Sequence, residues 1–349
     1  MRESRKQPMI WIPAFAGMTN WKRPGVPPPL TVISYPPLRK RSMIPVQSKC
    51  QAGWMSDNSA SRFEDHQELG QYIPLHYHFQ MLAEPNRMAG FKAAIDLVVP
   101  AGGKVVDLGA GTGALSFFAA RKAARVHAVE MLPELAEFAR KHLERNGCAD
   151  RVDITIGDAR AYLPPEPVDV VICEMLHSAL LREKQLEVIR SFKARYREAF
   201  GDTLPVLLPY ATVLGVEPVQ ANFSFEGYEA SISLFEAPGA PSPRFRSLGE
   251  ARPYGILEYH RDFSTAFRIE QTLAIATAGR FNALRFITKN VLAMAPDNRG
   301  TVDWMNQHLI LPLKAAEDAK AGERFRVCFD YAAGAPIRAL QSSIEVTPP

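Results

Sequence analysis

The sequence predicts an α/β fold in which an open, Rossmann-like sheet is followed by a β-rich, barrel-like domain. Between residues 81 and 199, helical and strand-like patterns alternate, as they do in a parallel sheet with crossover helices. Beyond Pro205, short β-like runs separated by turn-rich pieces replace that alternation. With 349 residues and 47% hydrophobic content, the chain can build a sizeable core and two domains. We therefore expect domains at 55–204 and 205–349, after a leader at 1–54.

The leader, residues 1–54, is basic and rich in proline, and we expect it to be disordered. It holds nine lysines and arginines, one acid and nine of the 28 prolines, without helical or strand period. Three interpretations compete. A signal peptide would have its apolar part interrupted by Pro8 and Pro13, and an organelle-targeting leader is the second possibility. The third, which we prefer, is a start codon assigned too far upstream, with Met55 the real start, because residues 11–19 resemble translated bacterial intergenic repeats.

The rest of the chain, residues 55–349, carries 32 basic and 36 acidic residues, which gives no general case for nucleic-acid binding. The four cysteines, Cys50, Cys148, Cys173 and Cys328, are widely spaced, so neither a metal site nor a disulfide framework is expected. No apolar run approaches 18 residues, so we expect no membrane span. A cytoplasmic enzyme is the simplest interpretation.

Four short β-branched or apolar runs predict the strands of the first domain, at 105–108, 125–129, 152–156 and 168–172. Helical patterns lie between them at 88–99, 114–124 and 132–146, and one long helix or two follow at 178–200. In the second domain the expected strands are 206–208, 212–217, 231–235, 268–276, 285–287, 305–311 and 325–331. Turn-rich pieces at 236–243 and 296–300 separate some of these runs.

A glycine-rich turn follows the first strand and contains Gly109, Gly111 and Gly113. Glycines let the backbone approach a ligand closely, and the helix that follows offers free N–H groups. The same string fits a dinucleotide-binding pattern, so the glycines alone do not decide between ligands. Asp107 stands two residues before the first glycine, where a carboxylate suits an ammonium group and is poorly placed beside a pyrophosphate.

Acids also end the next two strands of the predicted sheet. Glu130 lies 23 residues after Asp107, where an acid can accept hydrogen bonds from both hydroxyls of a ribose. Asp158, after the third strand, is placed to meet an adenine amino group, and we include its neighbour Ala159 in the same site. With Glu174 at the end of the fourth strand, the ordered set is similar to that of class I S-adenosylmethionine-dependent methyltransferases.

Glu174 and Glu183 are nine residues apart at the end of a buried strand. A carboxylate at the C-terminal end of a central strand faces the ligand crevice of an open α/β sheet, and two of them make a pocket suited to a cation. At this point the chain resembles the protein arginine methyltransferases, whose two glutamates have this spacing in a so-called double-E loop. The resemblance spreads over most of 71–331, with apolar Leu180 and Leu181 where the family also carries apolar residues.

Several other positions fit that family. His78, Met81 and Arg87 match a short helix that covers the cofactor, and the resemblance implies a forked pair between Arg87 and the carboxylate of the cofactor. Tyr72 falls on the second tyrosine of a paired-tyrosine motif. Residues 207–212 look like the entry into the family's β-barrel.

Residues 302–307 look like the family's Thr-His-Trp loop, in which Trp304 would wall the slot for a long acceptor side chain. The chain departs from the family here: Val302 and Asp303 replace Thr-His, Met175-Leu176-His177 replaces Trp-Met-Gly, and Glu68 replaces the first tyrosine. These changes lie on the acceptor side, whereas the cofactor-side residues mostly match. Methyl transfer is therefore the firmer prediction, and arginine as acceptor is the weaker one.

The resemblance implies S-adenosylmethionine as cofactor, with Glu174 and Glu183 gripping a guanidinium and His177, Asp303 and Trp304 near the acceptor. His177, His308 or Asp303 could carry the proton that must leave, and the sequence does not choose among them. The acceptor is expected to be a protein or small molecule, with a cation preferred. A catalytically silent interaction module is the alternative from another class. The family's dimerising arm suggests a homodimer, but Pro238, Pro241 and Pro243 disfavour a helix in part of the corresponding region, 223–259.

Overall fold

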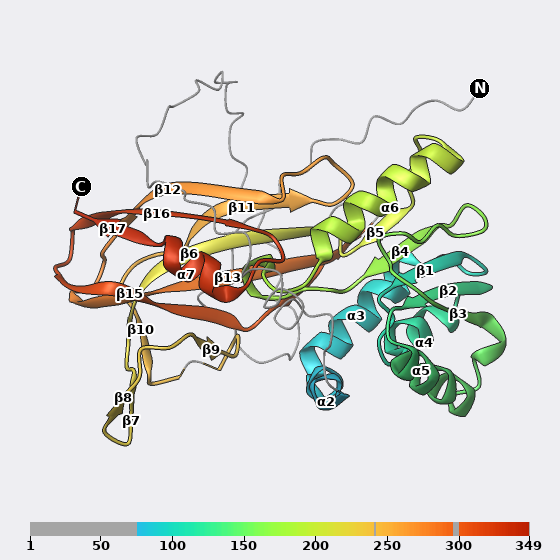
Figure 1. The fold of residues 1–349 in the computed structure, drawn as a ribbon, viewed down its shortest axis with the longest axis horizontal. Helices are drawn as coiled ribbons and strands as arrows, with labels where there is room; N and C mark the ends of the chain where they lie inside the picture. Colours follow the sequence, from blue (N-terminus) through green and yellow to red (C-terminus); the bar gives the residue numbers. More distant parts are fainter. Residues whose placement is uncertain (1–74, 241, 296–299, 349) are drawn as a thin grey trace, which may run out of the picture.

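The computed structural model describes residues 75–240, 242–295 and 300–348 (Figure 1). Tyr72 and the leader at 1–54 lie outside the described residues. Within the described chain, a parallel sheet occupies one side of the molecule and a larger β-rich part the other (Figure 1). This arrangement confirms the predicted fold class.

The parallel sheet has five strands in the order β3-β2-β1-β4-β5. They are β1 (Lys104–Leu108), β2 (Arg125–Glu130), β3 (Val152–Ile156), β4 (Val170–Cys173) and β5 (Val206–Leu208). The chain order reverses direction at β1, whose neighbours are β2 and β4. Ligands of open α/β sheets bind at the carboxyl ends of the strands beside such a reversal. All four predicted strands of this half are present.

Helices flank this sheet: α2 (Leu75–Ala83), α3 (Pro85–Val98), α4 (Ala114–Ala120), α5 (Pro133–Arg145) and α6 (Gln185–Phe200). The start of α5 shows how the sequence sets a boundary, because Pro133 stands at its first position and Glu134 lies in its first turn. Gly147, at a positive φ of 64°, follows its end. Helix α3 packs against both α4 and strands of the β-rich part, so it lies between the two halves.

The β-rich part is built on a seven-stranded antiparallel sheet. Its members are β6 (Ala211–Ala221), β9 (Leu234–Glu236), β10 (Phe245–Ser247), β11 (Arg252–Glu258), β13 (Gly279–Met294), β14 (Thr301–Met305) and β15 (His308–Ala319). A three-stranded sheet joins β12 (Ala266–Ala274), β16 (Arg324–Ala332) and β17 (Glu345–Thr347), with α7 (Ile337–Ser343) between the last two. The hairpin of β7 (Ser224–Phe225) and β8 (Tyr228–Glu229) projects from this half (Figure 1).

Three sequence-based expectations need correction. Strand 206–208 was expected in the β-rich half, but it pairs with β4 as the last strand of the parallel sheet. Residues 305–311 are not one strand, because Asn306 and Gln307 form the turn between β14 and β15. Of the predicted helix at 178–200, only Gln185–Phe200 is α-helical, after a single 3-10 turn, Ser178–Leu180. The described residues of 223–259 contain strands and no helix, as the prolines indicated for part of that region.

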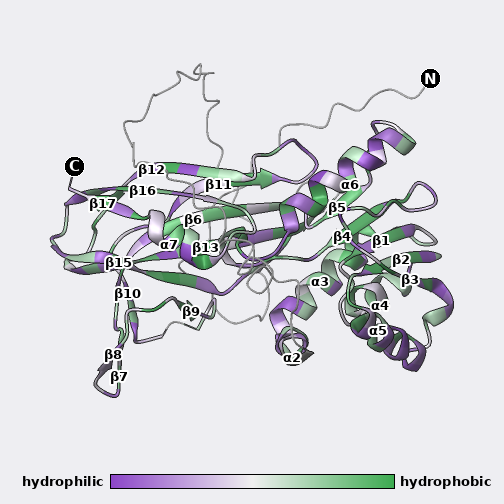
Figure 2. Cartoon of the chain, viewed as in Figure 1, coloured by the Kyte–Doolittle hydropathy of each residue, from purple (hydrophilic) through white to green (hydrophobic). Residues whose placement is uncertain are grey.

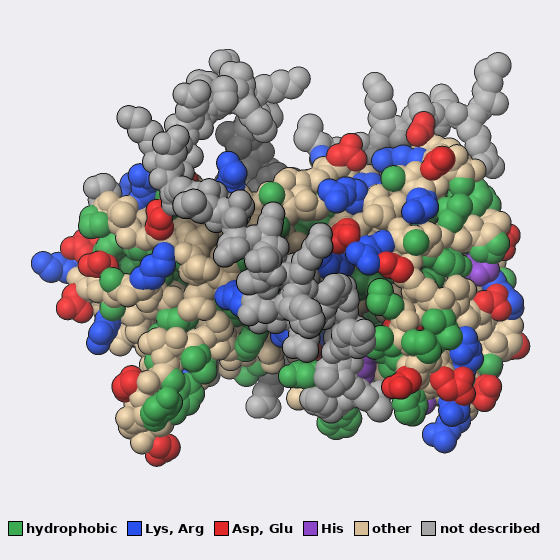
Figure 3. All heavy atoms as spheres, in the orientation of Figure 1, with side chains coloured by type: hydrophobic (Ala, Val, Ile, Leu, Met, Phe, Trp, Pro, Cys, Tyr) green, Lys and Arg blue, Asp and Glu red, His purple; other side chains and the backbone are tan. Residues whose placement is uncertain are grey.

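The interior strands of both halves carry the most hydrophobic residues (Figure 2). The largest buried cluster includes Phe91 of α3, Ile172 of β4, Phe286 of β13 and Trp304 of β14, so one core runs through both halves. The face seen in Figure 3 carries charged side chains of both signs, intermingled over most of the described surface. No helix of the described chain is long and apolar enough to span a membrane.

Candidate active site

A cavity with an empty volume of about 1200 Å³, partly open to solvent, lies at the carboxyl edge of the parallel sheet. Its wall is formed by the turn after β1, the ends of β2, β3 and β4, and residues of α2 and α3. Ten of the predicted site residues line it: His78, Met81, Arg87, Gly109, Gly111, Glu130, Asp158, Ala159, Glu174 and Glu183. The structure thus brings together residues that are up to 105 positions apart in the chain.

The glycine turn has a backbone that only glycine adopts without strain. Gly109, Gly111 and Gly113 have φ values of 80°, 56° and 82°. A Cβ on Gly109 would overlap the Met175 side chain, so the turn also needs the missing side chain for space. Gly113 does not line the cavity; it is the N-cap of α4, and a Cβ there would lie 3.3 Å from that of Ala139. Gly113 therefore allows α4 and α5 to pack closely.

Glu130, at the end of β2, is held by two backbone donors. Its Oε2 accepts a hydrogen bond of 2.9 Å from the Gly111 N–H, and its Oε1 accepts one of 2.9 Å from the Leu132 N–H. Each carboxylate oxygen can accept a further hydrogen bond. Because Glu130 lines the cavity, this remaining capacity can serve a pair of hydroxyls such as those of a ribose.

Asp107 lies beneath the cavity rather than in its lining. It is almost fully buried, and its Oδ2 accepts a hydrogen bond of 2.6 Å from the Ser116 hydroxyl of α4. Burial raises the pKa of Asp107 to about 6, against the opposing effect of the Ser116 bond. A contact with an ammonium group, as predicted from the sequence, would stabilise the ionised form.

Asp158 is bound by Arg160, a residue that the sequence did not predict as part of the site. The Arg160 side chain donates to both carboxylate oxygens of Asp158, with distances of 2.6 to 3.0 Å, and lowers the pKa of Asp158. The Arg160 Nη1 also donates to Glu187 Oε1 of α6 at 3.2 Å. Since Arg160 lines the cavity, it belongs to the site. Its position two residues after Asp158 could have indicated this role, but an arginine at that position is equally typical of an exposed surface residue.

The Arg87 guanidinium forms an ion pair with the Glu174 carboxylate, and both side chains are about nine-tenths buried. Arg87 Nη1 also lies 3.4 Å from the Met81 carbonyl oxygen, while its Nε is buried without a partner in the described chain. The sequence predicted a pair between Arg87 and a cofactor carboxylate. The structure pairs Arg87 with Glu174 and leaves Nε without a partner among the described residues, so the pair with a cofactor carboxylate stays a prediction.

Glu174 and Glu183 both line the cavity, and burial is the largest influence on each. Burial raises the pKa of Glu174, although the Arg87 guanidinium opposes this. Burial and, next, the charge of Glu174 raise the pKa of Glu183 to about 8. No lysine, arginine or histidine of the described chain forms an ion pair with Glu183. The cavity lining carries four acids, Glu130, Asp158, Glu174 and Glu183, and three bases, Arg87, Arg160 and Lys184. Arg87 is paired with Glu174 and Arg160 with Asp158, so the unpaired Glu183 favours a cationic ligand beside it.

The segment between the glutamates has an unusual backbone. Ala179, Leu180 and Arg182 have φ values of 56°, 56° and 62°, a region that L-residues rarely occupy. The β-rich half holds this turn, since Ala179 N–H donates to Thr288 Oγ1 at 2.7 Å and Arg182 N–H donates to a backbone carbonyl at 2.9 Å. The placement of Glu183 thus depends on the β-rich half as well as on the parallel sheet.

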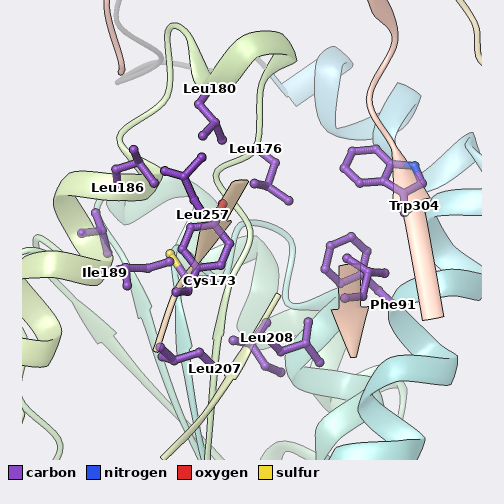
Figure 4. Close-up of a cluster of buried hydrophobic side chains, with 14 of the residues drawn as sticks. Phe91, Cys173, Leu176, Leu180, Leu186, Ile189, Leu207, Leu208, Leu257 and Trp304 are labelled. Atoms are coloured by element: carbon purple, nitrogen blue, oxygen red, sulfur yellow. The ribbon is translucent and has the colours of Figure 1, made fainter. Parts of the chain in front are cut away.

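The predicted acceptor-side residues do not line the cavity in the described structure. His177 packs edge-on against Phe235, and burial lowers its pKa to about 4. Asp303 forms an ion pair of 2.8 Å with Lys289. Trp304 belongs to the buried core, where it lies beside Phe91 (Figure 4), with ring centroids 5.9 Å apart.

Glu84 was also missed from the sequence. It stands between α2 and α3, and its Oε1 accepts a hydrogen bond of 2.9 Å from the Trp304 indole N–H. Its charge also raises the pKa of Glu174. Only the fold brings Glu84 to Trp304, which is 220 residues away in the chain, so no local pattern announced this contact.

The residues present fit S-adenosylmethionine. Glu130 has acceptor capacity for a ribose diol, and Asp158, Ala159 and Gly109, which has no side chain, line the same cavity. Two buried donors, Nε of Arg87 and a ring nitrogen of His78, have no partner among the described residues. Arg87 could thus bind a carboxylate, and His78 a further acceptor. The described residues contain no cluster of His, Cys, Asp or Glu arranged to hold a metal.

Comparison with known proteins adds independent findings. A family described as a methyltransferase domain matches residues 105–198, which includes the glycine turn and both glutamates. An uncharacterised protein of Methanothermobacter thermautotrophicus is 32% identical over 268 residues, 77% of this chain and 97% of that protein.

Two further proteins carry more specific names. An arginine N(omega)-methyltransferase of Streptomyces achromogenes is 35% identical over 135 residues, which is 37% of each chain. Among solved structures, the Trypanosoma brucei PRMT1 enzyme-prozyme heterotetrameric complex with AdoHcy has a TM-score of 0.60 and 19% identity, over 73% of this chain and 87% of that one. At this identity the structural match supports the fold alone.

Proposed function

The chain belongs to the same family as the Methanothermobacter protein and is a class I, S-adenosylmethionine-dependent methyltransferase resembling the protein arginine methyltransferases, and from this we propose that it methylates a guanidinium nitrogen held by Glu174 and Glu183. The methyltransferase activity rests on the match to the methyltransferase-domain family and on the named methyltransferase relative. The guanidinium acceptor and the two-glutamate mechanism are our proposal.

One observation carries the proposal: Glu183 is a partly buried acid in the same cavity as a second acid, Glu174, and it has no ion-pair partner among the described residues. A buried carboxylate without a counter-ion is costly, so such an arrangement is retained where a ligand supplies the missing positive charge. A guanidinium is planar and presents N–H groups in a fork that two carboxylates can bind together.

The two glutamates would act by orientation and electrostatics. A bound guanidinium donates N–H bonds to both carboxylates, which fixes its plane and concentrates electron density on the nitrogen that faces the methyl donor. S-adenosylmethionine, when bound, supplies an electrophilic methyl group on its sulfonium. Arg87 would hold the carboxylate of that molecule, and Glu130 would hold its ribose hydroxyls.

Glu183 is the residue we assign to the proton that leaves the guanidinium. Glu183 lines the cavity, and its pKa of about 8 before an acceptor binds makes it a stronger base than an ordinary carboxylate. The candidates named from the sequence fit less well: burial lowers the pKa of His177 and of His308 to about 4, and neither lines the cavity. Asp303 forms an ion pair with Lys289.

Two kinds of guanidinium acceptor are open. An arginine within a protein is one, by analogy with the protein arginine methyltransferases. Free arginine or another small guanidine is the second, which the name of the Streptomyces relative favours. Met175, Leu176 and His177 follow the first glutamate and replace the residues that protein arginine methyltransferases usually carry there. These changes are relevant to whether the acceptor is a protein or a small molecule.

We also propose that the protein self-associates. Tyr228, Ile232 and Phe235, on and beside the β7–β8 hairpin, are exposed apolar side chains, with Tyr228 73% exposed. The Trypanosoma neighbour is described as a heterotetrameric complex, which is compatible with assembly in this fold. Sedimentation of the purified protein, with Tyr228→Ser as the comparison, tests this, and a monomer at all concentrations would contradict it.

The function is tested by methyl transfer from radiolabelled S-adenosylmethionine to three acceptors: free L-arginine, an arginine-glycine peptide, and the same peptide with lysine. We expect label on one or both arginine acceptors and none on the lysine peptide. Glu183→Gln should abolish transfer while S-adenosylhomocysteine still binds, measured by calorimetry. Glu198→Gln, which changes an exposed acid of α6, the helix that follows Glu183, should change neither. Transfer to lysine alone, or full activity of Glu183→Gln, would refute the proposal.

A further inference from the structure

Five buried polar side chains form one polar cluster around the segment that carries the two glutamates. They come from separate elements of both halves, and each is at most 6% exposed. The five are Gln185 of α6, Tyr259 after β11, Thr212 of β6, Asn290 of β13 and Asn306 between β14 and β15. Buried polar groups that are satisfied in this way define a single arrangement of the parts they join.

Gln185 binds the backbone on both sides of Glu174. Its Oε1 accepts a hydrogen bond of 2.8 Å from the Met175 N–H, and its Nε2 donates one of 2.8 Å to the Cys173 carbonyl oxygen. Gln185 is also the first residue of α6, two positions after Glu183. One side chain therefore connects the strand end that carries Glu174 to the helix start that follows Glu183.

The cluster continues from Gln185 into the β-rich half. The Gln185 side chain opposes the rise that burial causes in the pKa of Tyr259, so it lies close to that hydroxyl, which is 2.7 Å from Thr212 Oγ1. Thr212 Oγ1 in turn donates to Asn290 Oδ1 at 2.8 Å. The side chains of both β6 and β13 thus take part before the cluster returns to the site.

It returns through Asn306. Asn290 Nδ2 donates to Asn306 Oδ1 at 2.8 Å, and Asn306 Nδ2 donates to the carbonyl oxygen of Leu176 at 2.9 Å. Leu176 is the second residue after Glu174. The cluster therefore holds the glutamate segment at two places: Gln185 binds Cys173 and Met175, and Asn306 binds Leu176.

We propose that Gln185 is a positioning residue that sets the separation of Glu174 and Glu183, and that the cluster, through Asn306, holds the segment from its other side. This inference rests on the proposed two-glutamate mechanism for its effect on catalysis. The structural part of the inference, that Gln185 places the two carboxylates, does not depend on the identity of the acceptor.

The variant Gln185→Met tests the proposal, because methionine has a similar length and offers neither hydrogen bond. Two carboxylates that must grip one guanidinium tolerate little displacement, and a misplacement of about 1 Å can cost about 100-fold in rate. We expect kcat for the arginine acceptor to fall about 10- to 100-fold. The dissociation constant of S-adenosylhomocysteine should stay within about threefold of the wild-type value, since Gln185 does not line the cavity.

Tyr196→Phe is the matched control. The Tyr196 hydroxyl, on the same helix, accepts a hydrogen bond of 3.0 Å from the Val168 N–H and lies 3.3 Å from the Val168 carbonyl oxygen. Val168 precedes the other end of β4, so this variant also removes two buried bonds between α6 and the strand region, away from the glutamates. We expect a comparable fall in melting temperature and an unchanged kcat.

Asn306→Leu provides a second variant if Gln185→Met does not fold. It breaks the cluster at Leu176 and should lower kcat, with cofactor affinity kept. Crystal structures of the variants with S-adenosylhomocysteine supply the readout that is independent of activity. Displacement of Glu174 relative to Glu183 in Gln185→Met or Asn306→Leu, but not in Tyr196→Phe, is the expected result.

The outcomes separate the two proposals. If wild-type protein fails to methylate any guanidinium but the displacement is seen, the proposed function is wrong and the positioning inference holds. If both carboxylates stay in place in the variants, or if Tyr196→Phe loses as much kcat as Gln185→Met, the positioning inference is overturned.

Discussion

The guanidinium of Arg87 and the carboxylate of Glu174 form a buried ion pair, with 8% and 10% of their side chains exposed. Arg87 comes from α3 and Glu174 from the end of β4, so the pair ties a covering helix to the sheet. Glu174 would otherwise be a second uncompensated acid beside Glu183. The Arg87 guanidinium opposes the rise that burial causes in the pKa of Glu174, so the pair favours the ionised form of this glutamate.

Replacement of Arg87 by methionine should destabilise the protein strongly, because it leaves Glu174 buried without its partner. Breaking a buried ion pair from one side costs about 3–5 kcal/mol. The double variant Arg87→Met with Glu174→Met should recover much of this loss, since no charge is then left buried. Urea unfolding of the three proteins measures it, and a double variant less stable than Arg87→Met would contradict the assignment.

The stability of the free protein should fall as pH rises from about 4.5 towards 8, in part because of Glu183. Its pKa is raised to about 8 on folding, so the folded state holds a proton that the unfolded chain releases at lower pH. Stability from this group is complete below the unfolded pKa and is lost as pH rises through the folded one. Asp107, with a pKa of about 6, contributes in the lower part of the same window.

Melting temperature measured from pH 5 to 9 for wild type and Glu183→Gln isolates the Glu183 contribution, because Asp107 is common to both proteins. We expect the two curves to converge at low pH, apart from a constant offset, and Glu183→Gln to become relatively more stable as pH approaches 8. Parallel curves over the whole range would show that Glu183 is ionised throughout.

Gly109→Ala should prevent cofactor binding, whereas Gly147→Ala should not. Both glycines have a positive φ, 80° and 64°, so each substitution carries a backbone cost of about 1–2 kcal/mol. Only at Gly109 would the added methyl group collide with the Met175 side chain; at Gly147 nothing lies within 4 Å. Calorimetry with S-adenosylhomocysteine should show at least a tenfold difference between the variants, and equal affinities would contradict a close approach at Gly109.

Arg160→Gln should weaken cofactor binding about three- to tenfold, because the fork that fixes Asp158 at the cavity wall is lost. Arg125→Gln is the matched control: Arg125 donates to Asp153 at 2.5 Å in a somewhat more exposed pair outside the cavity lining. Its loss should leave affinity unchanged. A similar effect of both substitutions would mean that Arg160 acts through general stability.

The sequence predicts the strand ends well because parallel strands leave short, β-branched patterns, and their acids then fall at one edge. It predicts the partners of those acids poorly, because partners come from other elements. Ser116, which donates to Asp107, comes from helix α4, and Glu84 accepts from Trp304, which is 220 residues away in the chain. Trp304 itself was expected at an acceptor slot, but a large apolar ring is also the side chain a core most readily buries.

The single hydrophobic core that extends from Phe91 of α3 to Tyr331 of β16 has a consequence for unfolding. Two domains with separate cores can melt at different temperatures, whereas parts that share one core lose their packing together. The sheet that carries the cofactor cavity and the β-rich half should therefore unfold in one cooperative step. A fragment cut at the junction after β5 would expose apolar surface on both pieces, so neither half is expected to persist as a folded unit without the other.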